Sequence, residues 1–129
     1  MARGLEAHKL RVRQCHALGK NLSRRAKSKC ELCQQSRPLQ VVELLPLPEQ
    51  PTEEWALLLC QECQPFSKEK IQVDDPHRLQ FLHESIWSEI TPIQVLSIRL
   101  TRHLEKNKVT WVQGMLDSLY IDPEIESKL

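Results

Sequence analysis

The sequence repeats one cysteine pattern, Cys30-Glu31-Leu32-Cys33 and, after 26 intervening residues, Cys60-Gln61-Glu62-Cys63. Two residues between cysteines permit a tight turn, a knuckle, that directs both sulfur atoms at one ion, and two knuckles supply a closed tetrahedral zinc site. In a reducing compartment such paired motifs indicate a metal site rather than disulfides. The sequence therefore predicts one structural Zn²⁺ bound by Cys30, Cys33, Cys60 and Cys63.

The segment between the knuckles has the composition of two short strands. Residues 40–45 are rich in β-branched and apolar side chains, and prolines 46, 48 and 51 then break the chain into a loop. The apolar run 55–59 leads into the second knuckle. This arrangement is typical of a zinc ribbon or of a treble clef, in which a helix over 64–70 would follow the second knuckle. Both interpretations stay open.

Helical periodicity predicts helices on both sides of this zinc module. An amphipathic helix is expected over 5–27, with an apolar stripe that consists of Leu5, Val12, Cys15, Leu22 and Ala26. Three helices are expected over 78–90, 91–107 and 110–120, and they should form a bundle because short amphipathic helices need packing partners. The middle helix should begin with Thr91 as its N-cap and Gln94 closing a capping box.

The predicted architecture is therefore mainly α with a small β zinc module. A basic amphipathic N-terminal helix occupies residues 1–29, the four-cysteine zinc module residues 30–70, and a helical domain with a three-helix bundle residues 71–129. A chain of 129 residues has the size of one domain, so we expect the three segments to form one compact unit.

Positive charge is concentrated at the N-terminus. Residues 1–29 contain nine basic side chains and one acidic side chain, whereas the whole chain has a formal charge of only +1. At 100° per residue five basic residues share one face of the expected helix: Lys9, Arg13, Lys20, Arg24 and Lys27. This face could contact nucleic acid or another anion, neutralise the zinc thiolates and acidic helices internally, or serve as a solvated or partner-docking surface.

Several functional classes are excluded by composition. The three glycines are too few and too scattered for a glycine-rich phosphate loop. No apolar run approaches the roughly 18 residues of a membrane span, and residues 1–6 lack the apolar core of a signal peptide. We therefore expect a cytoplasmic protein without a membrane partner, and we expect Cys15 to be a small buried side chain rather than a reactive thiol.

The sequence resembles the PhnA-like family, named after a bacterial alkylphosphonate-utilisation operon, over about residues 28–126. The similar segments are 28–33, 42–46, 58–63, 82–90, 92–95 and 116–123. Gln34 follows the first knuckle where the family often has glycine, and His83 stands where asparagine is usual. The resemblance implies a zinc-binding helical protein and, through the operon name, an association with phosphonate metabolism.

No set of residues forms a legible catalytic site. Within the most family-like segment, Glu84, Ser85 and Glu89 are the candidate lining of a ligand pocket, although capping and inter-helix hydrogen bonding are the more ordinary roles of such side chains. The sequence favours a non-catalytic binding or regulatory module. The alternatives are an enzyme or accessory protein of phosphonate or phosphate-ester metabolism, and a DNA-binding regulator that uses the basic helix.

The order of knuckle, strand, loop, apolar run and knuckle is also similar to the zinc-bound scaffold of HNH endonucleases. Those enzymes bind a catalytic cation through histidines at the end of the strand. Here residues 17–76 contain no histidine, and Glu43 alone cannot supply both the metal ligands and the general base.

The sequence therefore predicts that the protein has no metal-dependent nuclease activity. Plasmid DNA incubated with the protein and Mg²⁺ or Mn²⁺ should remain supercoiled on an agarose gel. Cleavage that disappears in Glu43→Ala would contradict this prediction, because it would identify a catalytic cation at the strand.

Overall fold

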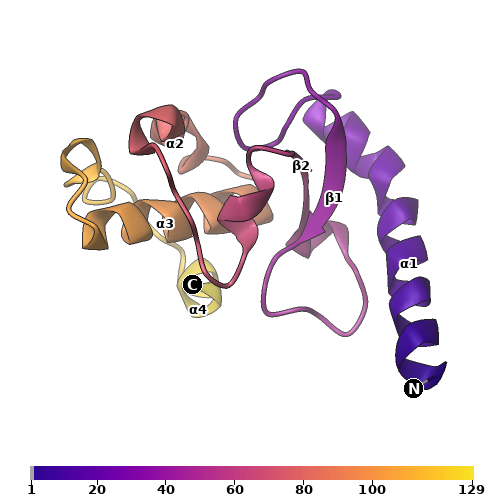
Figure 1. The fold of residues 1–129 in the computed structure, drawn as a ribbon. Coiled ribbons are helices and arrows are strands. Elements are labelled where there is room, and N and C mark those ends of the chain that lie inside the picture. Colours follow the sequence, from indigo (N-terminus) through magenta and orange to yellow (C-terminus); the bar gives the residue numbers. More distant parts are fainter. Residues whose placement is uncertain (1) are drawn as a thin grey trace.

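The computed structural model describes residues 2–129, and about half of the chain is helical. A two-stranded sheet lies between two long helices, so the chain forms three layers (Figure 1). The first layer is α1 (Ala2–Ala26), the sheet pairs β1 (Leu39–Glu43) with β2 (Ala56–Cys60), and the third layer is α3 (Thr91–Lys106).

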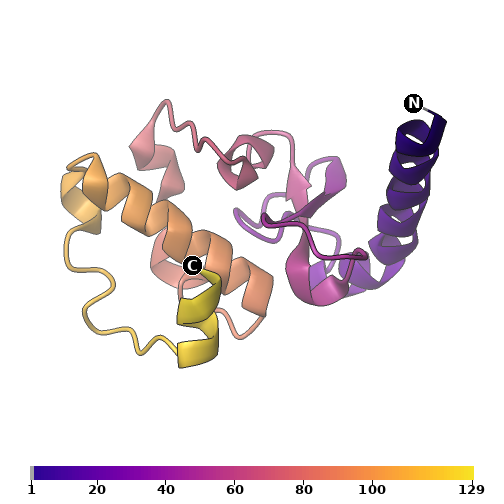
Figure 2. The same ribbon diagram turned by 90° about the horizontal axis from the view of Figure 1, so that it is seen from below.

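Two short helices lie beside α3, on the side of the molecule away from α1 (Figure 2). They are α2 (Leu82–Ser85) and α4 (Pro123–Lys128). No helix within residues 2–129 has the length and apolar character that a membrane crossing requires.

The second strand is the centre of the core because both of its faces are covered. The strands are antiparallel, with Leu39 opposite Cys60, and every residue of β2 is buried. Alternate side chains point to opposite faces of a strand. Ala56 and Leu58 accordingly pack with Leu22 of α1, whereas Leu57 and Leu59 belong to the larger cluster that includes α3. Burial on two faces explains why the sequence of β2 is a continuous apolar run rather than an alternating one.

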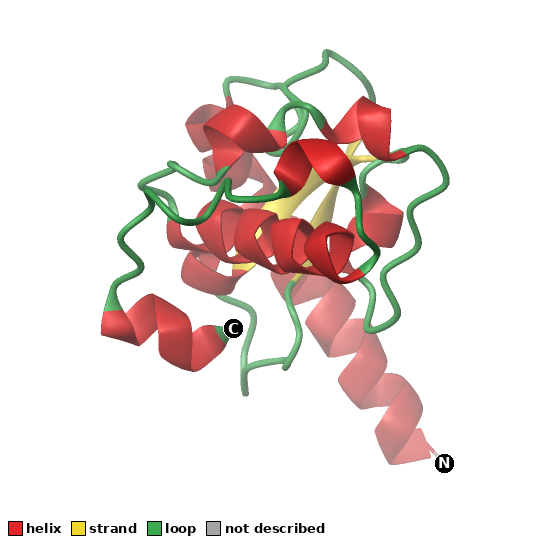
Figure 3. Cartoon of the chain, turned by 90° about the vertical axis from the view of Figure 1, so that its left-hand side faces the viewer, coloured by secondary structure: helices red, strands yellow, loops and turns green. Residues whose placement is uncertain are grey.

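The first helix is predicted with nearly the observed bounds, but its predicted apolar stripe is only partly correct. Leu22 and Ala26 pack against the sheet together with Leu18. Leu5 and Val12 are 57% and 40% exposed, because the N-terminal turns of α1 extend beyond the sheet (Figure 3). The packing face therefore covers only the C-terminal half of the helix.

The third helix matches its predicted range but begins differently. Ile90, not Thr91, is the N-cap residue, and no side chain caps this end. The side-chain amide of Gln94 instead donates a hydrogen bond to the backbone carbonyl oxygen of Ile86 at 3.0 Å, which connects the helix to the preceding turn. Asn107, the last residue of the predicted range, is the C-cap, and Lys108 after it has a left-handed backbone conformation, at φ 61°.

The predicted helix over 78–90 is wrong as a continuous element. A 3₁₀ turn at Pro76–Leu79 is followed by the single turn of α2 and then by bends. The hydroxyl of Ser88 accepts a hydrogen bond from the Ile90 backbone amide at 3.1 Å. Serine side chains that bond local backbone in this way compete with helical hydrogen bonding.

The predicted helix over 110–120 is also absent. Thr110–Val112 forms one 3₁₀ turn, and non-helical turns follow. Gly114 has φ +82°, in the left-handed region that interrupts a right-handed helix. In place of the expected three-helix bundle, the structure therefore has one long helix, α3, surrounded by short turns.

Candidate metal centre

The structure brings the four predicted cysteines to one point. One knuckle follows α1 and the other begins at the last residue of β2, and together they hold Cys30, Cys33, Cys60 and Cys63. The four Sγ atoms all lie within 4.8 Å of one another. Three of the cysteines are buried, and Cys33 is half-buried.

The dimensions of this cluster suit a tetrahedral metal ion. A zinc–thiolate bond of about 2.3 Å places neighbouring sulfur atoms about 3.8 Å apart in a tetrahedron. The Sγ atoms of Cys33 and Cys60 are 3.7 Å apart. All five cysteines within residues 2–129 are free thiols, so no disulfide competes for these sulfur atoms. Four soft sulfur donors are the set that zinc or iron takes in a closed site.

The electrostatics of the crowded thiols favour a bound cation. Hydrogen bonding from Cys63 lowers the pKa of the Cys30 thiol, and nearby backbone amides contribute further. The same contact raises the pKa of Cys63, while burial raises the pKa of Cys33. Without a cation the Cys30 thiolate is thus stabilised by hydrogen bonding from the Cys63 thiol, and a divalent ion bound at the cluster would favour the thiolate form further.

Backbone hydrogen bonds fix the shape of each knuckle. The Gln34 amide donates to the Cys30 carbonyl oxygen at 2.8 Å, and the Cys63 amide donates to the Cys60 carbonyl oxygen at 3.0 Å. Gln34 has φ 64°, a left-handed conformation that glycine adopts most easily.

A buried ion pair attaches the first knuckle to the rest of the fold. The carboxylate of Glu31, 1% exposed, accepts two hydrogen bonds of 2.7 Å from the guanidinium of Arg25. It also accepts one from the Leu58 backbone amide at 2.9 Å. Arg25 donates in addition to the carbonyl oxygens of Glu53 and Ala56. These two side chains therefore connect α1, the knuckle and the start of β2.

Sequence reasoning missed Glu31 as a structural residue. Its position inside a knuckle gave no indication of burial, because acidic side chains are usually exposed. The available signal was the arginine six residues earlier, at the end of a helix that leads directly into the knuckle.

The five basic residues predicted to share one helix face are all exposed: Lys9, Arg13, Lys20, Arg24 and Lys27. The prediction is wrong for Lys27, which lies beyond the end of α1 with φ 55°. Within the described residues none of them forms an ion pair with an acidic side chain. The acidic side chains Glu31 and Glu43 are instead paired with Arg25 and Arg11, respectively. The exposed face thus retains its positive charge.

The candidate pocket residues of the helical segment are separated by the structure. Glu84 and Ser85 line a groove of about 550 Å³ beside the first knuckle, and Glu89 is exposed outside its lining. The Ser85 hydroxyl accepts a hydrogen bond from the Ser97 hydroxyl at 2.7 Å, an inter-helix contact of the ordinary kind.

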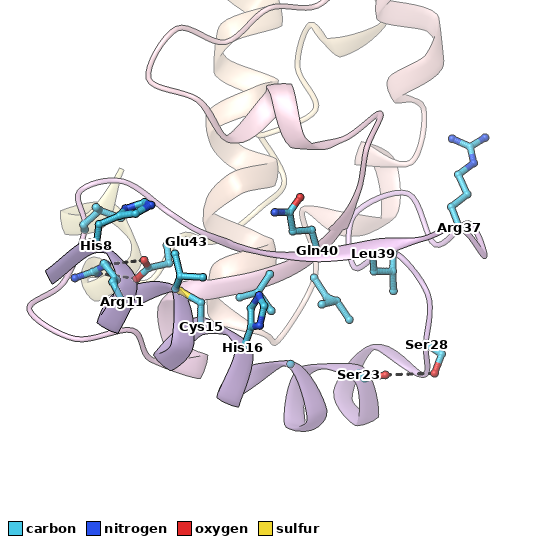
Figure 4. A pocket seen from close by; sticks show the side chains of 15 residues that line it. His8, Arg11, Cys15, His16, Ser23, Ser28, Arg37, Leu39, Gln40 and Glu43 are labelled. Atoms are coloured by element: carbon cyan, nitrogen blue, oxygen red, sulfur yellow. Dashed lines mark hydrogen bonds and ion pairs between the residues drawn. The ribbon is translucent and has the colours of Figure 1, made fainter. Parts of the chain in front are cut away.

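A second groove, of about 800 Å³, lies between α1 and β1 (Figure 4). Arg11 crosses one end of it and forms a bidentate pair with Glu43. Cys15 lies half-buried in this groove rather than fully buried as predicted, and burial raises the pKa of its thiol. Because Glu43 is engaged by Arg11, it is not a free carboxylate beside the sheet.

No protein-family model, curated protein or solved structure matches this chain. The class of site therefore rests on its own geometry: a cluster of four cysteine thiols positioned to hold one metal ion.

The buried ion pair makes Arg25 a stability determinant. Arg25→Met should lower the free energy of unfolding by about 3 kcal/mol, because it leaves the Glu31 carboxylate buried without its partner. Urea denaturation followed by circular dichroism measures the loss. Arg24→Met, at the exposed neighbouring position, should change stability by no more than about 0.5 kcal/mol. Equal losses in the two variants would contradict the proposed role of the pair.

The left-handed backbone at Gln34 gives a second prediction. Gln34→Gly should raise the free energy of unfolding by about 0.5 to 1 kcal/mol, because glycine removes the steric cost of this conformation. Gln34→Val should lower it, since β-branched residues tolerate positive φ poorly. In the control Gln35→Gly, at a position without positive φ, glycine should be destabilising. The same denaturation measurement distinguishes these outcomes.

Proposed function

We propose that this chain is a non-catalytic binding module of the PhnA-like kind, with a fold organised around one structural Zn²⁺. The observation that carries the proposal is the convergence of four cysteine sulfur atoms within 4.8 Å of one another. Four thiolates complete the coordination of zinc and leave no position for a substrate or an activated water molecule. This chemistry supports a structural rather than a catalytic metal.

Zinc is favoured by the ligand set and by the local fold. Two CxxC knuckles joined by a short antiparallel hairpin are a common zinc-binding unit. The 3₁₀ turn Gln64–Ser67 occupies the place where a treble clef has its α-helix, which supports the description of a shortened treble clef. Free thiolate ligands also require a reducing environment, and they support a cytoplasmic location as part of the proposal.

The family-like segment packs against the cysteine cluster, which supports folding of the chain as one cooperative module. Ile93 belongs to the apolar cluster that contains the three buried cysteines, and Phe81 and Ile90 pack against this cluster, as Cys33 does. The groove beside the first knuckle is lined by this segment and by the knuckle together. We therefore place any ligand-binding role of the module near this junction rather than in a separate catalytic domain.

Metal analysis tests the proposal directly. Purified protein should contain one zinc per chain by elemental analysis, and Cys60→Ser should lose the metal and the cooperative unfolding of residues 30–63, because metal binding and folding are coupled in small zinc modules. Cys15→Ser should retain both. A protein that stays folded and cooperative after complete chelation would contradict a structural role for the metal, and iron in the purified protein would contradict zinc.

A further inference from the structure

The groove beside the first knuckle combines cationic and aromatic side chains from distant parts of the sequence. Lys27 and Lys29 contribute from the chain that leaves α1, while Glu84 and Trp87 contribute from the α2 segment. The groove has a volume of about 550 Å³. Trp87 is 53% exposed, although its neighbour Ile86 is buried. A large aromatic ring is thus available to a ligand between the two walls.

The lysines of this groove are not used to neutralise the protein itself. Within the described residues neither Lys27 nor Lys29 forms an ion pair, and both are exposed. Arg25, which also lines the groove, is occupied by Glu31. Two free ammonium groups beside an exposed indole form a site for a ligand with both an anionic and a planar aromatic part.

The positive charge continues from the groove along α1. The basic stripe, defined as Lys9, Arg13, Lys20, Arg24 and Lys27, spans about 23 Å of helix from Lys9 to Arg24 at 1.5 Å per residue, and Lys27 follows directly after the last residue of α1, with φ 55°. At 100° per residue its four members within α1 lie opposite Leu18 and Leu22, which pack against the sheet, so they face solvent. Lys27 belongs to both the stripe and the groove, which makes the two surfaces continuous.

We propose that this continuous surface binds single-stranded nucleic acid. One base stacks on the Trp87 indole, the adjacent phosphates contact Lys27 and Lys29, and the strand continues along the basic stripe. Stacking on an aromatic ring beside a positively charged track is the general mode of single-strand binding. The Glu84 carboxylate can accept a hydrogen bond from an N–H group of the stacked base, which in thymine and uracil is N3–H.

Single strands suit this surface better than duplexes do, because the bases of a duplex are stacked on one another and leave none free for Trp87. The sequence of the N-terminal helix offers no aromatic ring, and only folding brings one beside its lysines. This inference rests on the proposed binding module and names its ligand class.

The test uses the full chain with a fluorescein-labelled oligonucleotide of twelve thymidines or twelve uridines, followed by fluorescence anisotropy. Contacts from Lys29 and the five residues of the basic stripe should give a log–log salt slope of about −4.2, at about −0.7 per contact on single strands. Lys27→Glu together with Lys29→Glu should flatten the slope by about 1.4. The matched pair Lys68→Glu with Lys70→Glu, at exposed positions outside the groove, should leave it unchanged.

Stacking is tested at Trp87. Trp87→Ala should weaken binding about tenfold, within the usual range for loss of one stacked base, and Trp87→Phe should recover part of the loss. Tyr120→Ala is the matched control, because Tyr120 is 79% exposed and lies outside the groove. Equal effects of Trp87→Ala and Tyr120→Ala would overturn the inference.

Further binding measurements distinguish single-strand binding from duplex binding and from a failure of the proposed zinc module. Duplex DNA of the same length should bind at least tenfold more weakly, and equal or tighter binding of the duplex would overturn the single-strand assignment. Absence of oligonucleotide binding by zinc-loaded protein at 50 mM salt would overturn the inference and leave the proposed zinc module intact. Binding by a protein that contains no zinc would instead contradict the proposed function.

Discussion

The meeting of two cysteine pairs is the constraint on which the rest of this fold depends. A hairpin of two five-residue strands is marginal in water on its own. The knuckles close this hairpin at its end, where Leu39 pairs with Cys60, and the cluster fixes the separation between the end of α1 and the end of β2. Helices on both faces of the sheet then bury β2 completely. The apolar core thus grows around a strand whose position the cysteines determine.

The acidic residue within the first knuckle has two structural consequences. Its carboxylate accepts from the β2 backbone and from Arg25, so the knuckle, the sheet and α1 share one buried polar contact. Burying this charge is tolerated because several charge-assisted hydrogen bonds satisfy it. The contact also determines how positive charge is distributed: Arg25 is directed inward, while Arg24 and the remaining stripe are directed to solvent. One residue inside a metal-binding turn thereby holds the last arginine of the adjacent helix against the sheet.

The parts of the fold that sequence reasoning predicted are those with a local physical signature. Cysteine spacing indicated the metal cluster, and β-branched and apolar runs indicated both strands to within two residues. The third helix was predicted because its apolar spacing is sustained over four turns. The prediction of a helix over 110–120 was wrong because Gly114 has a left-handed backbone, which a short apolar pattern does not reveal. The Arg25–Glu31 pair had only a local hint in the sequence, the arginine six residues before Glu31, and the neighbourhood of Trp87 had none, because both depend on which segments become adjacent after folding.

The N-terminal turns of α1 lie beyond the sheet, and this position has a consequence for their dynamics. Residues 4–10 are all exposed, and the first tertiary anchor is Arg11, whose guanidinium contacts Glu43 and the carbonyl oxygen of Pro48. Helical hydrogen bonds without tertiary packing open by local fraying, whereas those near Leu22 open only with the core. Amide hydrogen exchange should therefore slow progressively along α1 from Leu5 towards Leu22, so that a single helix would report both local and global opening.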